Sequence, residues 1–111
     1  MNVPAEFRQR FFILNMRIEN SEALAAVDVV RKHLGASAAV WLFGSRVDDA
    51  LKGGDVDLYV ETDEINLTIP VARARGELAD LLGRYVDLVV NNHTKEQAIY
   101  DIAKSQGVRL A

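Results

Sequence analysis

The sequence predicts a single domain of the α+β class, of the α/β type, in which a small mixed β-sheet is covered by helices. Segments with helical apolar spacing alternate along the chain with short apolar runs of strand length. A glycine closes each helical segment. The length of 111 residues fits one domain with one modest core. These three observations together favour a sheet with helical cover over an all-helical or all-strand domain.

Two helices are expected in the first four fifths of the chain. The first is expected over residues 21–34, with Ser21 as its N-cap and Gly35 at its end. Its apolar residues recur at helical spacing: Leu24, Val27, Val30 and Leu34. The second is expected over residues 71–82, is closed by Gly83, and has an apolar stripe formed by Val71, Ala74, Leu78, Leu81 and Leu82.

A third helix is expected near the C-terminus. Thr94 and Gln97, three residues apart, form a capping-box signature, and Gly107 lies beyond the last apolar position. The expected apolar stripe consists of Ala98, Ile99, Ile102 and Ala103.

Three strands are expected between these helices, over residues 37–43, 55–61 and 85–90. The first is a short apolar run that ends at a glycine and contains Trp41, which we expect in the core. The second alternates strictly, so that one face carries Val56, Leu58 and Val60. The opposite face carries Asp55, Asp57, Tyr59 and Glu61. We therefore expect a strand with one dry face, and Tyr59 on the other face could either pack or stack on a base.

Composition and charge exclude several classes of protein. Half of the residues are hydrophobic and 26% are charged, which is typical of a soluble globular protein and not of a disordered one. A net charge of −3 provides no general attraction to nucleic acid or to an anionic membrane. The absence of cysteine excludes disulfides and thiolate sites. No apolar run suits a signal peptide or a membrane span, so a cytoplasmic location is expected.

The domain is expected to occupy residues 16–111, and residues 1–15 are interpreted as an N-terminal extension. The sequence from Met16 onward reads as a natural start for the domain. Two alternatives remain open for the extension. It is either loosely attached and flexible, or it docks as a short helix through Phe7, Phe11 and Phe12.

Three aspartates occupy strand positions that usually hold other residue types. Asp55 and Asp57 are two residues apart, so their carboxylates point to the same side of a strand, and Asp87 lies in the next strand between Val86 and Leu88. Asp is depleted in strands, and clustered carboxylates repel one another unless a cation neutralises them. The expected cation is Mg²⁺, which prefers carboxylate and phosphate oxygens. The alternative is an exposed edge strand whose charges discourage aggregation.

The residues that follow the first strand suggest a phosphate site. Gly44 permits a sharp turn and a close approach of the ligand, and Ser45 could begin a short helix with free N–H groups. Arg46 and Lys52 would add positive charge. The alternative is a plain turn followed by a helix cap and solvated surface charges.

The combination of these features resembles the minimal nucleotidyltransferases of the DNA polymerase β superfamily. Their pattern is a hydrophobic residue followed by Gly-Ser, a spacer, two aspartates alternating with hydrophobic residues, and a later aspartate between hydrophobic residues. The matching segments of this sequence are "FGS" at 43–45, "DVDL" at 55–58 and "VDLV" at 86–89. The resemblance covers roughly residues 16–111 and implies a nucleotidyltransferase fold.

The resemblance also implies roles for single residues. Gly44 and Ser45 would hold a nucleoside triphosphate, with Arg46 as a further candidate contact. Asp55 and Asp57 would bind Mg²⁺. Asp87 would be the third metal-site and catalytic carboxylate, and a candidate base for the attacking hydroxyl.

Minimal members of this superfamily are typically paired with a helical HEPN protein of the ribonuclease-toxin class. The resemblance implies that the chain transfers AMP from ATP to a tyrosine of that toxin, acts as its antitoxin, and forms a hetero-oligomer with it. Neither membrane binding nor direct nucleic-acid binding is expected. Two alternatives stay open: a non-catalytic antitoxin that neutralises its partner by occlusion, and a nucleotidyltransferase that acts on RNA or a small molecule.

Overall fold

The computed structural model describes residues 19–43 and 56–111. The described chain forms, in order, α2 (Asn20–Leu34), β1 (Ala39–Phe43), β2 (Val56–Glu61), α3 (Thr68–Leu82), β3 (Val86–Asn91), α4 (Ala98–Gln106) and β4 (Val108–Arg109). None of the described helices is both long and apolar enough to span a bilayer. The predicted extension, residues 1–15, lies outside the described residues.

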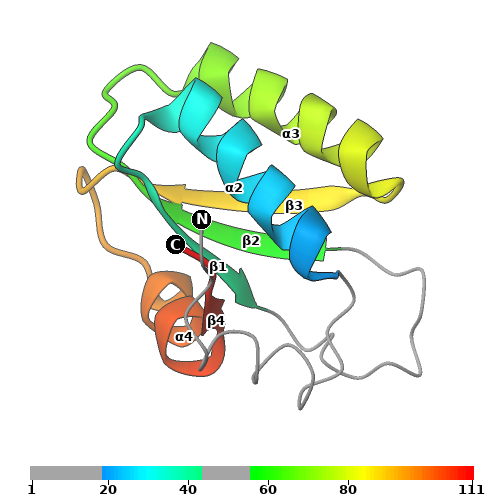
Figure 1. The fold of residues 1–111 in the computed structure, drawn as a ribbon. Coiled ribbons are helices and arrows are strands. Elements are labelled where there is room, and N and C mark those ends of the chain that lie inside the picture. Colours follow the sequence, from blue (N-terminus) through cyan, green and yellow to red (C-terminus); the bar gives the residue numbers. More distant parts are fainter. Residues whose placement is uncertain (1–18, 44–55) are drawn as a thin grey trace.

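The strands form one mixed sheet in the order β3-β2-β1-β4. β2 and β3 are parallel and are joined through α3, whereas β1 pairs antiparallel with both β2 and β4. Helices α2 and α3 lie side by side on one face of the sheet, and α4 covers part of the opposite face (Figure 1). This arrangement confirms the predicted α+β fold. The two-residue strand β4 was not predicted, because so short a strand leaves no periodic signal.

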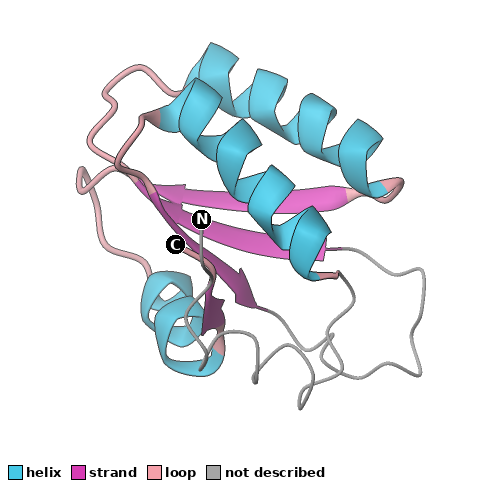
Figure 2. Cartoon of the chain, in the orientation of Figure 1, coloured by secondary structure: helices cyan, strands magenta, loops and turns pink. Residues whose placement is uncertain are grey.

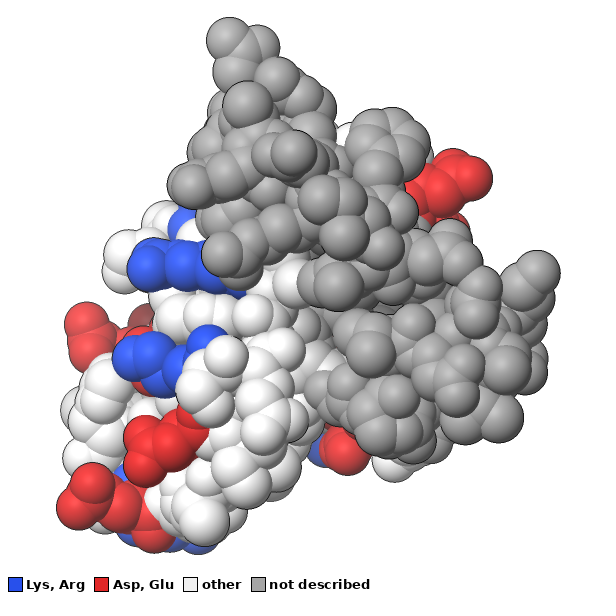
Figure 3. All heavy atoms as spheres, turned by 90° about the horizontal axis from the view of Figure 1, so that it is seen from below, with Lys and Arg blue, Asp and Glu red and all other residues white. Residues whose placement is uncertain are grey.

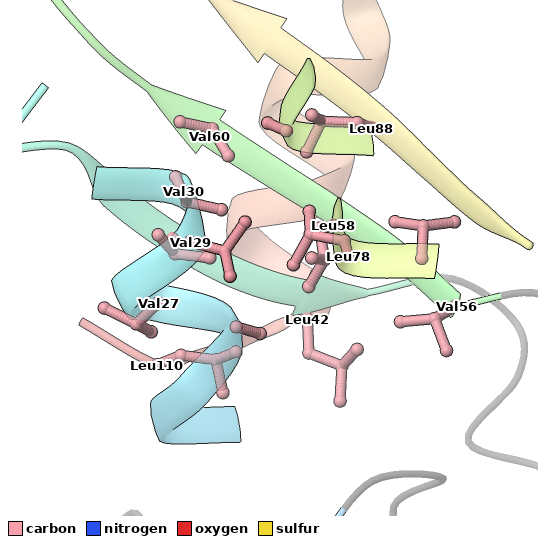
Figure 4. Packing of buried hydrophobic residues seen from close by; sticks show 14 of the residues in the cluster. Val27, Val29, Val30, Leu42, Val56, Leu58, Val60, Leu78, Leu88 and Leu110 are labelled. Carbon is pink, nitrogen blue, oxygen red and sulfur yellow. The ribbon is translucent and has the colours of Figure 1, made fainter. Parts of the chain in front are cut away.

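The main core lies between the sheet and the helix pair α2 and α3. Alternation along β2 directs its apolar side chains to this face, and all three are buried: Val56, Leu58 and Val60. Val30 from α2 and Leu78 from α3 have no exposed surface and belong to the same cluster (Figure 4). The apolar sides of α2 and α3 therefore pack against the sheet, as the helical spacing of their apolar residues predicts.

A second, smaller cluster lies on the opposite face, beneath α4. Trp41 and Tyr59 are neighbours in the antiparallel ladder, with ring centroids 5.2 Å apart, and Tyr100 of α4 lies 5.6 Å from the Tyr59 ring. Tyr59 has no exposed surface. The expectation that β2 has only one dry face is therefore wrong, because α4 packs on the other. Trp41 is buried, as predicted.

The helices begin at residues other than those predicted. Helix α2 starts at Asn20, and the Glu22 side chain accepts a hydrogen bond from the Glu19 backbone N–H at 3.0 Å, so Ser21 is not the N-cap. Thr94 is not the cap of α4, because its hydroxyl donates to Asn92 Oδ1 at 2.6 Å and the helix starts at Ala98.

Helix α3 starts three residues before the predicted position, at Thr68, and includes Pro70 in its first turn. Proline is tolerated there because the first N–H groups of a helix have no partner within the helix.

Three apolar residues assigned to helical stripes are exposed. Leu81 of α3 and Ile102 of α4 lie 40% and 44% exposed, and Ala98 at the start of α4 is also exposed, so these three expectations are wrong. The predicted ends of both helices are correct. Gly83 adopts the left-handed conformation that favours glycine and donates its N–H to Ala79 O.

Gly107 follows α4 with an extended backbone, so its role differs from that of Gly83. A Cβ at this position would overlap the carbonyl oxygens of Ala103 and Leu42. Glycine therefore allows the end of α4 to approach β1 closely.

Candidate active site

Asp57 and Asp87 lie next to each other on neighbouring strands. They are Cα partners in the parallel pairing of β2 and β3, whose strands are about 4.8 Å apart. Asp57 shares the face of β2 that carries Tyr59, so both carboxylates lie on the α4 side of the sheet. Asp57 is half-buried and Asp87 is exposed. The fold thus brings together two carboxylates that are 30 residues apart in the sequence.

The end of β1 lies beside this carboxylate pair. Phe43, the last residue of β1, is the antiparallel partner of Asp57. Gly44 follows Phe43 directly in the chain. The predictions for Gly44, Ser45, Arg46 and Asp55 concern positions outside the described residues.

Farther along the same face, β2 and β3 carry a polar network that the sequence analysis missed. The Tyr59 hydroxyl donates to Glu61 Oε2 at 2.7 Å and accepts from Asn91 Nδ2 at 3.0 Å. Lys104 of α4 completes the network with an ion pair to Glu61 at 3.2 Å. The alternation of polar residues on β2 is a sequence signal for this network. The packing of α4 above these residues leaves no signal in the sequence of β2.

The environment of Tyr59 identifies it as a structural residue. Burial raises the pKa of its hydroxyl to about 12, and the nearby Glu61 carboxylate acts in the same direction. The hydroxyl therefore stays protonated at neutral pH. Of the two alternatives for Tyr59, packing is the one that its complete burial supports.

A hollow of about 630 Å³ lies at the end of the strands opposite to Asp57 and Asp87. Tyr59 and Glu61 contribute to it from β2 and Asn91 from β3, and loop 93–97 and α4 contribute the rest. Its lining contains charges of both signs, and the face that carries α4 shows the same mixture (Figure 3). The charge pattern therefore does not select one class of ligand for this hollow.

The carboxylate pair suits Mg²⁺ by the chemistry of its donors. Two adjacent carboxylates supply the hard oxygen ligands that Mg²⁺ prefers. Among the described residues no group of three or more His, Cys, Asp or Glu side chains converges. The third predicted ligand, Asp55, belongs to the part of the chain that the structure does not describe. Asp57 and Asp87, the two described members of the predicted donor set, therefore have donor chemistry that fits the metal.

The fold is similar to that of solved toxin-antitoxin complexes. A structure of a tri-AMPylated Shewanella oneidensis HEPN toxin in complex with an MNT antitoxin matches with a TM-score of 0.67 and 21% identity, over 86% of this chain and 72% of that chain. A structure of the toxin-antitoxin MntA-HepT matches with a TM-score of 0.67 and 19% identity, over 84% and 72% of the two chains.

At these identities the likeness establishes the fold alone. A comparison with curated protein sequences finds no match. The family model described as "Polymerase beta, Nucleotidyltransferase" matches residues 27–110, which is most of the chain. The chain therefore belongs to the polymerase beta nucleotidyltransferase family.

Proposed function

We propose that this protein is a Mg²⁺-dependent nucleotidyltransferase that moves AMP from ATP to a tyrosine hydroxyl of a HEPN toxin, and thereby acts as an antitoxin. One structural observation carries the proposal for this member of the polymerase beta family: Asp57 lies beside Asp87 on the α4 side of the sheet. A family member that served only to bind a partner would have no chemical need for adjacent strand-borne carboxylates.

In this proposal the chain holds ATP, the donor of the AMP group, near the end of β1. Asp57, Asp87 and Asp55 are the metal ligands, and Gly44, Ser45 and Arg46 contact the triphosphate. Bound Mg²⁺ would neutralise charge on the triphosphate and on the leaving pyrophosphate. The register of Phe43 with Asp57 supports this assignment, because Phe43 directly precedes the Gly-Ser segment in the sequence and pairs with a residue that carries a carboxylate.

The transfer itself is a displacement at the α-phosphorus of ATP. The acceptor oxygen forms a bond to that phosphorus, the bond to the pyrophosphate oxygen breaks, and the hydroxyl proton is lost. Asp87 is the candidate base, because its exposed carboxylate can be reached by a partner's side chain. The main work of the protein is to position the two reactants and neutralise charge.

The acceptor is proposed from the structural neighbours. Both are complexes of toxin and antitoxin, and in one of them the HEPN toxin is tri-AMPylated. By analogy we assign this chain a HEPN toxin as both partner and acceptor, and a hetero-oligomer as the working assembly.

The test uses ATP labelled in its α-phosphate, Mg²⁺ and the cognate HEPN toxin that the proposal assigns as partner. Intact-mass measurement should show AMP additions to the HEPN protein with the wild type. Asp57→Asn keeps the shape of the side chain but removes its charge, so transfer should fall at least about a hundredfold. Asp80→Asn makes the same chemical change on the exposed surface of α3 and should leave transfer unchanged.

The complex between the two proteins should form equally well with both variants. If the wild type adds no mass but still neutralises the toxin, and Asp57→Asn neutralises it equally well, the chain is a non-catalytic antitoxin that acts by occlusion. If AMP appears on RNA or on a small molecule instead, the acceptor assignment is wrong.

A further inference from the structure

A second hollow, of about 600 Å³, lies beside the edge strand β3. Its walls come from the first half of α3, with Val71, Ala72 and Arg75, and from β3, with Leu88 and Val90. Tyr100 of α4, on the opposite face of the sheet, also lines it, whereas no residue of β2 does. The hollow therefore passes around the outer side of β3, and we call it the β3 edge groove.

The outer side of β3 has backbone hydrogen-bonding groups, and two of the residues that carry them, Leu88 and Val90, line this groove. Tyr85 O and Asn91 O accept bonds from the N–H groups of Val56 and Thr62, each at 3.0 Å. Successive residues of a strand direct their backbone groups to opposite sides, so the odd-numbered residues from 85 to 91 face β2. The even-numbered residues direct N–H and C=O outward: Val86, Leu88 and Val90. Within the described sheet, β3 is the last strand and no strand pairs with these groups (Figure 2).

Exposed sheet edges are usually blunted by proline, lysine or inward-pointing charge. The sequence of β3, "VDLVVN", has a single charged residue, Asp87, whose side chain lies on the α4 side and not in the groove. Ile65, at one end of the groove, is 81% exposed. The edge therefore combines unpaired backbone groups with apolar surface, which is the combination that binds an added strand.

Charge indicates the chemistry of the occupant. The lining contains two cations, Arg75 and Lys95, and no carboxylate, although the chain as a whole has a net charge of −3. Nε of Arg75 is buried and meets no hydrogen-bond acceptor in the described part of the chain. A carboxylate that entered the groove would pair with Arg75, and a second could pair with Lys95.

We infer that the β3 edge groove binds an extended acidic segment of a partner protein, which adds to the sheet as a strand beside β3. Alternate apolar side chains of that segment would pack between α3 and β3, and its carboxylates would pair with Arg75 and Lys95. This inference rests on the fold and not on nucleotide transfer, so it stands or falls separately from the proposed function.

The probe is a phage-displayed library of random decapeptides, selected on the full-length protein. We expect the selected peptides to alternate apolar residues and to contain Asp or Glu. Arg75→Glu should weaken their binding at least tenfold. Arg73→Glu makes the same charge change on the same helix outside the groove, and should change binding less than twofold. Lys95→Glu, in an exposed loop, should weaken binding at least threefold without affecting the fold.

Amide hydrogen exchange locates the bound peptide. Binding should slow exchange of the outward amides of Val86, Leu88 and Val90 at least tenfold. The inference is overturned if selection enriches no acidic peptide, if Arg73→Glu weakens binding as much as Arg75→Glu, or if the edge amides stay unprotected. It is also overturned if these amides are protected by concentration-dependent dimerisation, because the occupant is then a second copy of this chain.

Discussion

The two faces of the sheet differ although the same strands supply both. On the face under α2 and α3, β2 presents Val56, Leu58 and Val60, all buried. On the face under α4, the same strand presents Asp57, Tyr59 and Glu61, of which only Tyr59 is fully buried. One strand thus contributes apolar side chains to one face and polar side chains to the other, because successive side chains of a strand point to opposite faces.

The two faces also differ in how much of their surface is exposed, and this difference follows from the lengths of the helices that pack on them. Helices α2 and α3 have 15 residues each, whereas α4 has nine. The short helix covers the middle of its face, where the aromatic residues lie, and leaves Asp87 exposed. An exposed carboxylate such as that of Asp87 can therefore lie on the same face as a packed cluster without being buried by it.

The largest effect on stability is expected on the face under α2 and α3. Leu58→Ala removes a side chain with no exposed surface and should lower the free energy of unfolding by about 2–5 kcal/mol. Leu81→Ala, at a 40% exposed position of α3, should cost less than about 1 kcal/mol. Urea unfolding followed by circular dichroism measures both. Equal costs for the two variants would contradict the assignment of the core to this face.

A smaller effect is expected where α4 meets β1. Gly107→Ala places a methyl group against the carbonyl oxygens of Ala103 and Leu42 and should cost about 1–3 kcal/mol. Gly76→Ala, in the middle of α3, meets no atom within 4 Å and should stabilise the protein by about 0.5–1 kcal/mol. Thermal unfolding should therefore show a lower midpoint for Gly107→Ala and a higher midpoint for Gly76→Ala. A neutral Gly107→Ala would show that the approach of α4 to β1 is not tight.

The polar network under α4 should contribute less and should be sensitive to alkaline pH. Tyr59→Phe leaves Asn91 Nδ2 without its acceptor and should cost about 1 kcal/mol at pH 7. The pKa of Tyr59 is raised to about 12 in the folded state, from an ordinary value of 10.0. Its contribution is thus fully present below pH 10 and is lost as the pH rises towards 12. In urea unfolding across this range, the wild type should lose stability relative to Tyr59→Phe. If the difference in unfolding free energy between the wild type and Tyr59→Phe stayed constant across this pH range, the pKa of Tyr59 would not be raised.

The smallest effect is expected at the surface, between α2 and α3. Hydrogen bonds from His33, at 2.8 Å, and Lys32 hold the pKa of Glu77 below its ordinary value of 4.5. A lowered folded-state pKa gives stability that is present above pH 4.5 and is lost as the pH falls below it. Glu77→Gln should therefore lower the thermal midpoint slightly at pH 6 and not at pH 3. An equal loss at both values would show that charge is not the cause.

Much of the fold could be predicted from the sequence, because the signals for its core and helix ends lie within short segments. Alternation in β2 and helical spacing in α2 placed the core residues, and glycines placed the ends of α3 and α4. The pattern of aspartates predicted that three carboxylates, Asp55, Asp57 and Asp87, converge, and the register of the two described members, Asp57 and Asp87, agrees with that geometry. Their proposed roles as metal ligands remain predictions.

The features that were missed depend on contacts between distant segments. Burial of Tyr59 requires α4, which lies about 40 residues later in the chain. The exposure of Leu81 and Ile102 depends on which side of each helix faces the sheet, since their neighbours Leu82 and Ala103 are buried. The start of α4 was misplaced because Thr94 bonds to Asn92 instead of capping the helix. The β3 edge groove is visible only once the strand order is known.

In the proposed function, Asp57 and Asp87 on the α4 side of the sheet perform the chemistry, while the face under α2 and α3 provides stability. The most direct test measures AMP transfer to the HEPN partner by Asp87→Asn, an exposed position whose substitution should leave the unfolding midpoint unchanged. The account predicts that transfer falls at least about a hundredfold in fully folded protein. Transfer within threefold of the wild type would contradict it.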